Sequence, residues 1–241
     1  MLQALGNNRK RARSDEEKAL RRSHILHAAE SIFADVGYES FSMAKLSKKA
    51  GVVKGTLYLY FDTREEVFLV MYNRSLIRWG EAFVSSLRAS MSDLEYAELF
   101  YATYINDKGF SSLAARLEQS IKHNVSLKSF VESKRLFWER VGQIIKASAP
   151  VLGLTMTQSA EVFRALSVLM VGATRADQAP AFEDGTIPTD VQAVLASFSS
   201  KDLFINNANR LIVAIRSDKS EFRAGELVPT QVLGSAPDAF A

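Results

Sequence analysis

The chain has no cysteine and only 3 histidines among its 241 residues. Without cysteine, disulfide frameworks, thiolate nucleophiles and Cys-ligated zinc are excluded. His24 and His27 lie three positions apart, but nothing beside them completes a usual set of metal ligands. We therefore expect no metal site and no cofactor, and we interpret these two histidines as part of a solvated or interdomain face.

Long hydrophobic runs are also missing. The longest clean apolar run, near residues 165–174, falls well short of the roughly 20 residues that span a bilayer. Residues 1–13 lack the apolar stretch of a signal peptide. No nucleophile–base pair, metal set or phosphate-binding glycine loop is visible in the sequence. These absences predict a cytoplasmic protein that is not an enzyme.

Charge of either sign is modest in total but unevenly distributed. The net charge is +3. Residues 1–64 hold 12 Lys/Arg and 7 Asp/Glu, whereas the remaining residues hold 18 and 20. A basic head on a slightly acidic body fits a protein that presents one end to DNA, because neutralising phosphates releases condensed counterions.

Residues 42–67, with the sequence SMAKLSKKAGVVKGTLYLYFDTREEV, predict two short amphipathic helices around one tight turn. The first helix begins at Ser42, a good N-cap. Gly51 ends it, because glycine adopts the left-handed conformation without a Cβ penalty. The second helix, roughly residues 53–60, buries Leu57 and Phe61 on one face. Its other face offers charge, hydroxyls, methyls and an aromatic ring, so the pattern predicts a helix-turn-helix that reads DNA.

The stretch AGVVKGTLYLYF, followed by a short turn and REEVF, resembles the DNA-binding domain of TetR-family transcriptional repressors. The preceding HILHAAESIFADVGYESFSM resembles the family's first helix, so the resemblance covers about residues 22–68. It implies an all-α protein with an N-terminal three-helix helix-turn-helix DNA-binding domain. It also implies a larger C-terminal helical ligand-binding and dimerisation domain. The partners implied are a second copy, a pseudo-palindromic operator in double-stranded DNA and a small-molecule effector.

Matching this sequence to the family's motif implies DNA contacts at specific positions. They are Ser42, Lys45, Lys54, Gly55, Thr56, Tyr58, Leu59, Tyr60 and Arg64. Tyr60 and Arg64 match positions that commonly bind phosphate. Leu59 departs from the polar or ring residue frequent in the family, and a leucine offers only apolar contact, such as with a thymine methyl. Val53 replaces the usual capping serine. A solvated face for Lys48 and Lys49, and a core position for Tyr60, remain alternatives.

Composition and helix breakers divide the chain into four segments. Residues 1–14 are expected to form a flexible basic arm, either a solvated tail or a contact to the minor groove or phosphates. The DNA-binding domain follows at 15–63, the ligand-binding and dimerisation domain at 64–217, and a flexible tail at 218–241. Glycine and proline fall between most of the expected later helices, which are 64–91, 93–106, 110–123, 127–149, 157–177 and 190–216.

Aromatic residues accumulate after residue 99, and most of them fit a helical core. Polar and aromatic groups near them are candidates for an effector pocket, namely Tyr101, Tyr104, Glu118, His123, Trp138 and Arg175. Core packing or capping is the competing interpretation of each. The helices expected at 157–177 and 190–216 resemble in position the family's dimer interface. The predicted seam is Val162, Leu166, Leu169 and Met170.

The sequence thus predicts a dimeric repressor that a small apolar or aromatic ligand releases from its operator. The alternative is a DNA-binding architectural or protein-regulated factor without a small-molecule effector. The absence of an enclosed cavity in the C-terminal domain would favour this alternative.

Overall fold

The computed structural model describes residues 2–116, 121, 123–176, 187–197 and 200–218. Every regular element in these ranges is helical, which confirms the all-α prediction. Two compact units emerge: the N-terminal unit comprises residues 1–75 and 112–133, and the C-terminal unit comprises residues 76–111 and 134–241. No helix in the described part of the chain is long and apolar enough to cross a membrane.

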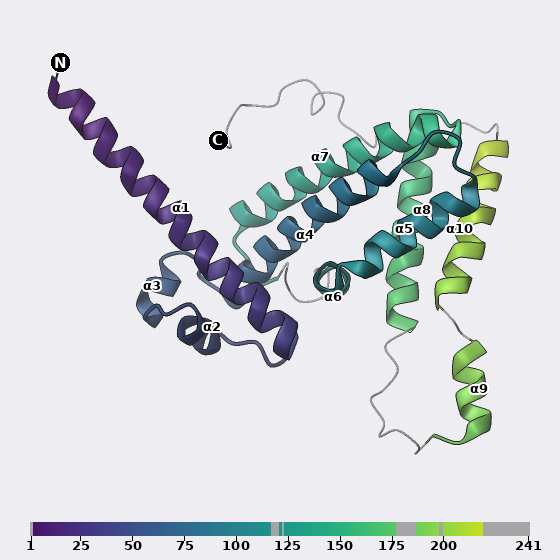
Figure 1. Ribbon diagram of the computed structural model, residues 1–241, viewed down its shortest axis with the longest axis horizontal. Helices are drawn as coiled ribbons and strands as arrows, with labels where there is room; N and C mark the ends of the chain where they lie inside the picture. Colours follow the sequence, from purple (N-terminus) through teal and green to yellow (C-terminus); the bar gives the residue numbers. More distant parts are fainter. Residues whose placement is uncertain (1, 117–120, 122, 177–186, 198–199, 219–241) are drawn as a thin grey trace. The chain divides into compact units, whose positions relative to one another are not determined.

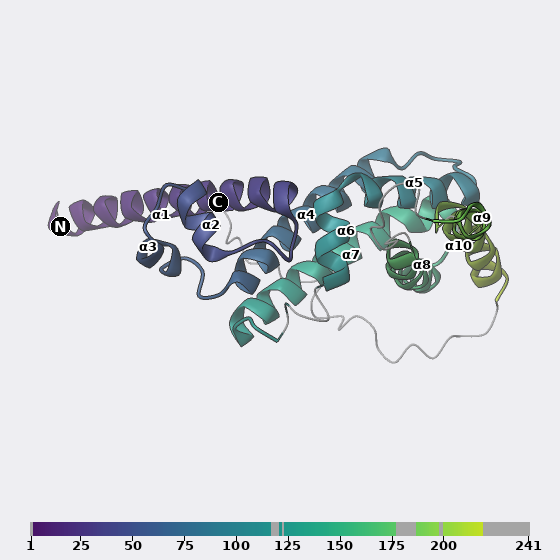
Figure 2. The same cartoon turned by 90° about the horizontal axis from the view of Figure 1, so that it is seen from below.

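Three helices form the head of the N-terminal unit: α1 (Leu2–Val36), α2 (Met43–Lys49) and α3 (Lys54–Tyr58). Figures 1 and 2 show α2 and α3 lying along the C-terminal half of α1. A continuous apolar core joins them, made of Ile25, Leu26, Ala29, Ile32, Phe33, Leu46, Leu57 and Phe61, all buried. Gly37 and Gly51 have φ of 68° and 62°, so both helix ends turn through the left-handed conformation, as the sequence predicts.

Helix α1 begins at Leu2 rather than near Asp15. The predicted start of the first helix at residue 15 is therefore wrong, whereas the flexibility of the basic arm over residues 1–14 stays a prediction. The physical reason is propagation: once the packed part of α1 is helical, each added residue gains one hydrogen bond without a new nucleation step. Leucine, alanine, arginine and lysine in this stretch favour helix, although Gly6 does not.

Seven more helices follow, each with a bounded range. They are α4 (Arg64–Ser86), α5 (Asp93–Asn106), α6 (Lys108–Arg116), α7 (Leu127–Leu152), α8 (Met156–Ala176), α9 (Thr189–Ser197) and α10 (Ser200–Ser217). α5 matches its predicted range because Ser92 caps it with a complete capping box, in which Glu95 bonds back to the cap. α10 packs along α8 and α5 in the C-terminal unit.

Several boundaries differ from the sequence prediction. α4 ends at Ser86, five residues before the predicted end. α7 continues past Pro150 to Leu152. The single helix predicted over 190–216 is two helices, α9 and α10. The predicted tail from residue 219 onward lies outside the described residues.

Rings from five helices form the core of the C-terminal unit. Trp79 of α4 lies at its centre, with ring centroids 5.2–6.4 Å from those of Phe83, Phe100, Tyr104, Phe110 and Phe163. Phe204 of α10 stacks on Phe100 at 6.0 Å. We call these seven residues the aromatic cluster. At the rim of this unit, the Arg216 guanidinium bonds both carboxylate oxygens of Asp93 and the Leu152 carbonyl, which ties α10 to α5 and α7.

Candidate nucleic-acid interface

The turn between α2 and α3 is fixed by hydrogen bonds to its backbone. Ser42 Oγ accepts from the Lys45 backbone N–H at 3.2 Å and caps α2. Ser47 Oγ donates to the Val52 carbonyl at 2.7 Å, across the turn. The His24 ring Nε2 lies 3.1 Å from the Ala50 carbonyl, so α1 satisfies the C-terminal end of α2. These bonds explain why so short a segment holds a defined angle between the two helices.

One side of α3 anchors it to the head. Leu57 is 0% exposed and Phe61 is 2% exposed. The Arg22 guanidinium lies 5.1 Å from the centroid of the Phe61 ring and covers it from α1. Because α3 has only five residues, this buried pair, and not helix propensity, holds the element in place.

The other side of α3 faces solvent with most of the predicted contact residues. Lys54, Gly55, Tyr58 and Leu59 are exposed, whereas Thr56 and Tyr60 are half-buried. The Lys54 Nζ lies 5.8 Å from the centroid of the Tyr58 ring, close enough for a weak cation–π contact. The structure therefore brings the predicted residues of α3 to one surface, with a positive charge held beside an aromatic ring.

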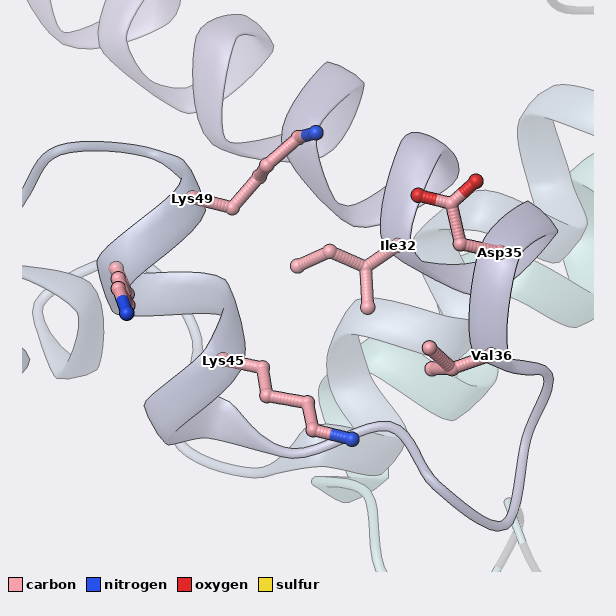
Figure 3. A pocket seen from close by; sticks show the side chains of 6 residues that line it. Ile32, Asp35, Val36, Lys45 and Lys49 are labelled. Atoms are coloured by element: carbon pink, nitrogen blue, oxygen red, sulfur yellow. The ribbon is translucent and has the colours of Figure 1, made fainter.

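Three lysines of α2 extend this surface. Lys45 donates from Nζ to the Ser40 carbonyl at 2.8 Å, and Lys48 and Lys49 are exposed. With α1 they border an open cleft of about 450 Å³, drawn in Figure 3 and lined by Ile32, Asp35, Val36, Lys45, Lys48 and Lys49. The positive charge of these three lysines adds attraction to phosphates, whichever of them makes a direct contact.

Arg64 has partners within the protein. Its guanidinium donates to the Glu65 carboxylate at 2.9 and 3.0 Å. It also lies over the Tyr38 ring, at 4.9 Å from the centroid, and Arg116 covers the same ring at 4.5 Å. The phosphate contact implied for Arg64 stays a prediction, and it would compete with these bonds.

The candidate effector residues occupy different environments. Tyr104 is buried in the aromatic cluster, and burial raises its pKa to about 12. The hydroxyls of Tyr101 and Ser200 lie 3.2 Å apart, between α5 and α10. Trp138 is 46% exposed on α7. His123 is exposed in the N-terminal unit, beside an open cleft of about 300 Å³. Glu118 and the side chain of Arg175 lie outside the described residues.

Sequence reasoning missed Trp79. It is 3% exposed, and its indole Nε1 is buried with no hydrogen-bond partner among the described residues. A buried, unpaired N–H costs about 1–3 kcal/mol relative to a paired one. The apolar spacing of α4 places this tryptophan in the core, but no pattern in the sequence reveals whether its N–H has a partner.

The predicted dimer seam requires a correction. Val162, Leu166 and Met170 are buried by the chain's own helices, and Leu169 is only partly exposed. The apolar stripe on α8 packs against the core of the same chain, which includes α10, and not against a second copy. The most exposed large apolar side chain on the described part of α8 is Val168, at 75%.

Comparisons with known families and proteins agree with this geometry. The family of bacterial regulatory proteins named tetR matches residues 25–71, and a tetracyclin repressor-like C-terminal domain matches residues 73–181. The fatty acid metabolism regulator protein of Bacillus subtilis is 25% identical over 159 residues, which cover 64% of this chain and 76% of that protein. The transcriptional repressor AcnR of Corynebacterium diphtheriae is 31% identical over 68 residues, or 28% of this chain and 36% of AcnR.

Solved structures share the fold. A TetR transcriptional regulator from Rhodococcus sp. RHA1 superposes with a TM-score of 0.55 at 17% identity, covering 85% of this chain and all of that one. A possible TetR family regulator from Streptomyces coelicolor A3(2) gives a TM-score of 0.53 at 15% identity, covering 81% and 98% of the two chains. The helix-turn-helix and the helical body thus occur together in both.

Proposed function

Since the chain belongs to the TetR family of DNA-binding transcriptional regulators, which are not enzymes, we propose that it is a dimeric repressor released from its operator by a small apolar ligand. The observation that carries the DNA-binding part is the division of α3 into two sides. Leu57 and Phe61 anchor the helix, and Lys54, Gly55, Tyr58 and Leu59 are left for the groove.

Support for an effector comes from the aromatic cluster. The Trp79 indole N–H there has no hydrogen-bond partner among the described residues, and the Tyr104 ring, which carries a hydroxyl, lies 5.9 Å from the Trp79 ring. Two polar atoms among rings are the kind of lining that orients an apolar ligand with one acceptor group. A ligand carbonyl or carboxylate would give the Trp79 N–H the partner it lacks. The relative from Bacillus subtilis is a fatty acid metabolism regulator, so acyl compounds are the first class to test.

The packing of the same cluster favours the second candidate function. Its rings lie against one another, and the two clefts described above are both open and lie in the N-terminal unit. A regulator without a small-molecule effector needs no space in its core. An effector that binds in the cluster must select a conformation in which the rings are further apart. It shifts the equilibrium between the closed and the open conformation only by as much as it prefers the open one.

Support for a dimer comes from α8 and α10, which pack side by side in the C-terminal unit. Val168 on α8 is exposed, as are Leu203 and Val213 on α10. Exposed apolar side chains on two adjacent helices fit a two-fold contact with a second copy, in which the same face meets itself. Light scattering at micromolar concentration tests this. The parent protein should have the mass of a dimer and Val168→Lys that of a monomer, whereas Leu94→Lys, on exposed α5 surface, should not change the mass.

Selection of fragments from a random DNA pool tests operator binding. We expect an inverted repeat, because two recognition helices related by two-fold symmetry read two half-sites. Lys54→Ala and Tyr58→Ala should weaken binding to the selected fragment at an unchanged melting temperature. Leu57→Ala should lower the melting temperature, because a buried leucine contributes about 2–5 kcal/mol. Full operator affinity in folded Lys54→Ala and Tyr58→Ala proteins would refute the assignment of the DNA-binding side of α3.

A ligand panel of acyl and aromatic compounds tests the effector. A true effector should raise the melting temperature and weaken operator binding by about 5–150-fold, the range of typical coupling energies. Trp79→Phe should weaken binding of an acceptor-bearing ligand and leave operator binding without ligand unchanged. Compounds that stabilise the protein but leave operator affinity unchanged would favour the regulator without an effector.

A further inference from the structure

Leu59 is 83% exposed, the highest value of any large hydrophobic side chain in the described part of the chain. Val53, just before the first residue of α3, is 73% exposed. Single exposed apolar residues are ordinary on protein surfaces. Here two of them bracket a five-residue helix whose other apolar residue, Leu57, is fully buried. The head can bury apolar side chains at this helix, and it leaves these two outside.

The same surface is poor in groups that read bases by hydrogen bonds. Arginine, lysine, asparagine, glutamine, aspartate and glutamate make the main discriminating contacts to base edges, with serine and threonine as less selective ones. Residues 53–59, with the sequence VKGTLYL, contain only Lys54 of the first group and Thr56 of the second. Thr56 is half-buried, and the Lys54 ammonium lies beside the Tyr58 ring. With only these two hydrogen-bonding side chains of the base-reading types, apolar contact is the other means by which this helix can discriminate bases. In the major groove the only methyl group belongs to thymine.

Gly55 lies one helical turn before Leu59, so the two share a face of α3. A Cβ added at Gly55 would meet no protein atom within 4 Å, and its φ is not in the left-handed region. Nothing in the protein's own fold therefore requires glycine at this position, although glycine costs about 1 kcal/mol of helix propensity relative to alanine. A glycine there leaves room for another molecule to approach the backbone beside Leu59.

Val53 gives an independent indication. It is the N-cap of α3, and no side chain caps the helix there. Serine, threonine, asparagine or aspartate would satisfy a backbone N–H at this position. Val53 provides no such bond and presents two methyl groups to solvent.

We propose that Leu59, with Val53, reads thymine C5-methyl groups in the major groove of each operator half-site. This inference rests on the operator binding proposed above. The two residues are six positions apart, about 9 Å along a regular helix, which is the length of two to three base-pair steps. Each half-site should hold thymines within that distance, and their methyl groups should account for much of the sequence preference.

Replacing single thymidines of the selected operator by deoxyuridine tests the proposal, because this change removes only the methyl group. Binding of the full-length protein to each substituted fragment is measured by gel shift. We expect at least one substitution in each half-site to weaken binding by about four-fold, the effect of one buried methyl. In Leu59→Ala the deoxyuridine at the Leu59 contact should have no further effect, since the two changes remove the same contact. Val53→Ser should behave likewise at a second thymine, and its melting temperature should not fall, because serine caps the helix.

Leu127→Ala is the matched control, with a leucine 78% exposed in the same unit but outside the helix-turn-helix. It should keep the parent's full sensitivity to deoxyuridine. The proposal is overturned if no deoxyuridine affects the parent protein, if the effects persist in Leu59→Ala and Val53→Ser, or if the selected half-sites contain no thymine. Failure to select any operator would instead refute operator binding itself.

Discussion

The apolar side chains of α3 and those of the aromatic cluster differ in what surrounds them. Leu59 and Val53 are exposed at the two ends of a five-residue helix, whereas Phe100 and Trp79 are buried against other rings of their own unit. An apolar residue contributes to stability in proportion to the area it removes from water. The cluster therefore stabilises the folded chain, and the exposed pair of α3 contributes its burial only when a second molecule covers it. Apolar character alone does not distinguish a core residue from a residue that contacts DNA bases.

Among the substitutions that test this comparison, Phe100→Ala is expected to lower the free energy of unfolding most. Phe100 is 1% exposed and contacts rings of α4, α8 and α10. Truncating such a ring leaves a cavity, so urea titration should show a loss of about 3–5 kcal/mol in the free energy of unfolding. Leu59→Ala should change the same quantity by less than about 0.5 kcal/mol. A comparable loss in both variants would show that Leu59 belongs to the core.

Much of the head could be predicted from the sequence because its signals are local. Ser42 and Gly51 mark both ends of α2, and Leu57 repeats the apolar spacing within one short segment. The C-terminal unit depends on partners that are distant in the chain. The apolar stripe of α8 that contains Leu166 predicts that this side of the helix is buried. No local pattern indicates whether α10 or a second copy of the chain covers it. In the structure the chain itself buries Leu166, and α10 packs along α8. Nor can sequence spacing show that the Trp79 N–H lacks a partner within the part of the chain that the structure describes.

Alkaline pH should destabilise the C-terminal unit through its buried phenols. Burial raises the pKa of Tyr104 to about 12 in the folded chain, against about 10 in the unfolded chain. Below pH 10 both states keep the proton. Between pH 10 and 12 only the unfolded state loses it, so the free energy of unfolding falls as pH rises, by on the order of 2 kcal/mol by pH 12.

Tyr104→Phe should remove this part of the pH dependence, measured by urea titrations from pH 9 to 12. Burial also raises the pKa of Tyr96 to about 12, so in Tyr104→Phe the contribution of Tyr96 to the pH dependence should remain. Tyr96→Phe also breaks the 2.8 Å hydrogen bond to Ser148, so it should lower stability at neutral pH as well. If Tyr104→Phe loses stability with pH as steeply as the parent, the phenol is not buried in the folded state.

Gly55→Ala should change the stability of the protein and its operator affinity in opposite directions. Alanine gains about 1 kcal/mol of helix propensity over glycine, and the added methyl meets no protein atom. The melting temperature should therefore rise by a few degrees while operator affinity falls. Unchanged or tighter operator binding would show that the DNA does not approach the helix at this position. Gly80→Ala differs from Gly55→Ala in that the added Cβ would contact a protein atom. That atom is the Cδ1 of Ile144 in the C-terminal unit, at 3.6 Å.

Among the substitutions in the aromatic cluster, the smallest effect on stability is expected for Trp79→Phe. The smaller ring loses dispersion contacts with Phe83, Phe110 and their neighbours, and large-to-small changes in a core are destabilising. The change also removes a buried N–H that has no partner among the described residues, which recovers about 1–3 kcal/mol of desolvation cost. Because the two terms oppose each other, urea titration should find a net change within about 1 kcal/mol of the parent. Trp79→Ala removes the same N–H along with the whole ring, so it should cost about 3–5 kcal/mol. A loss above about 3 kcal/mol in Trp79→Phe would mean that the indole N–H is satisfied by a bound water, which would remove the argument that a ligand acceptor pairs with it.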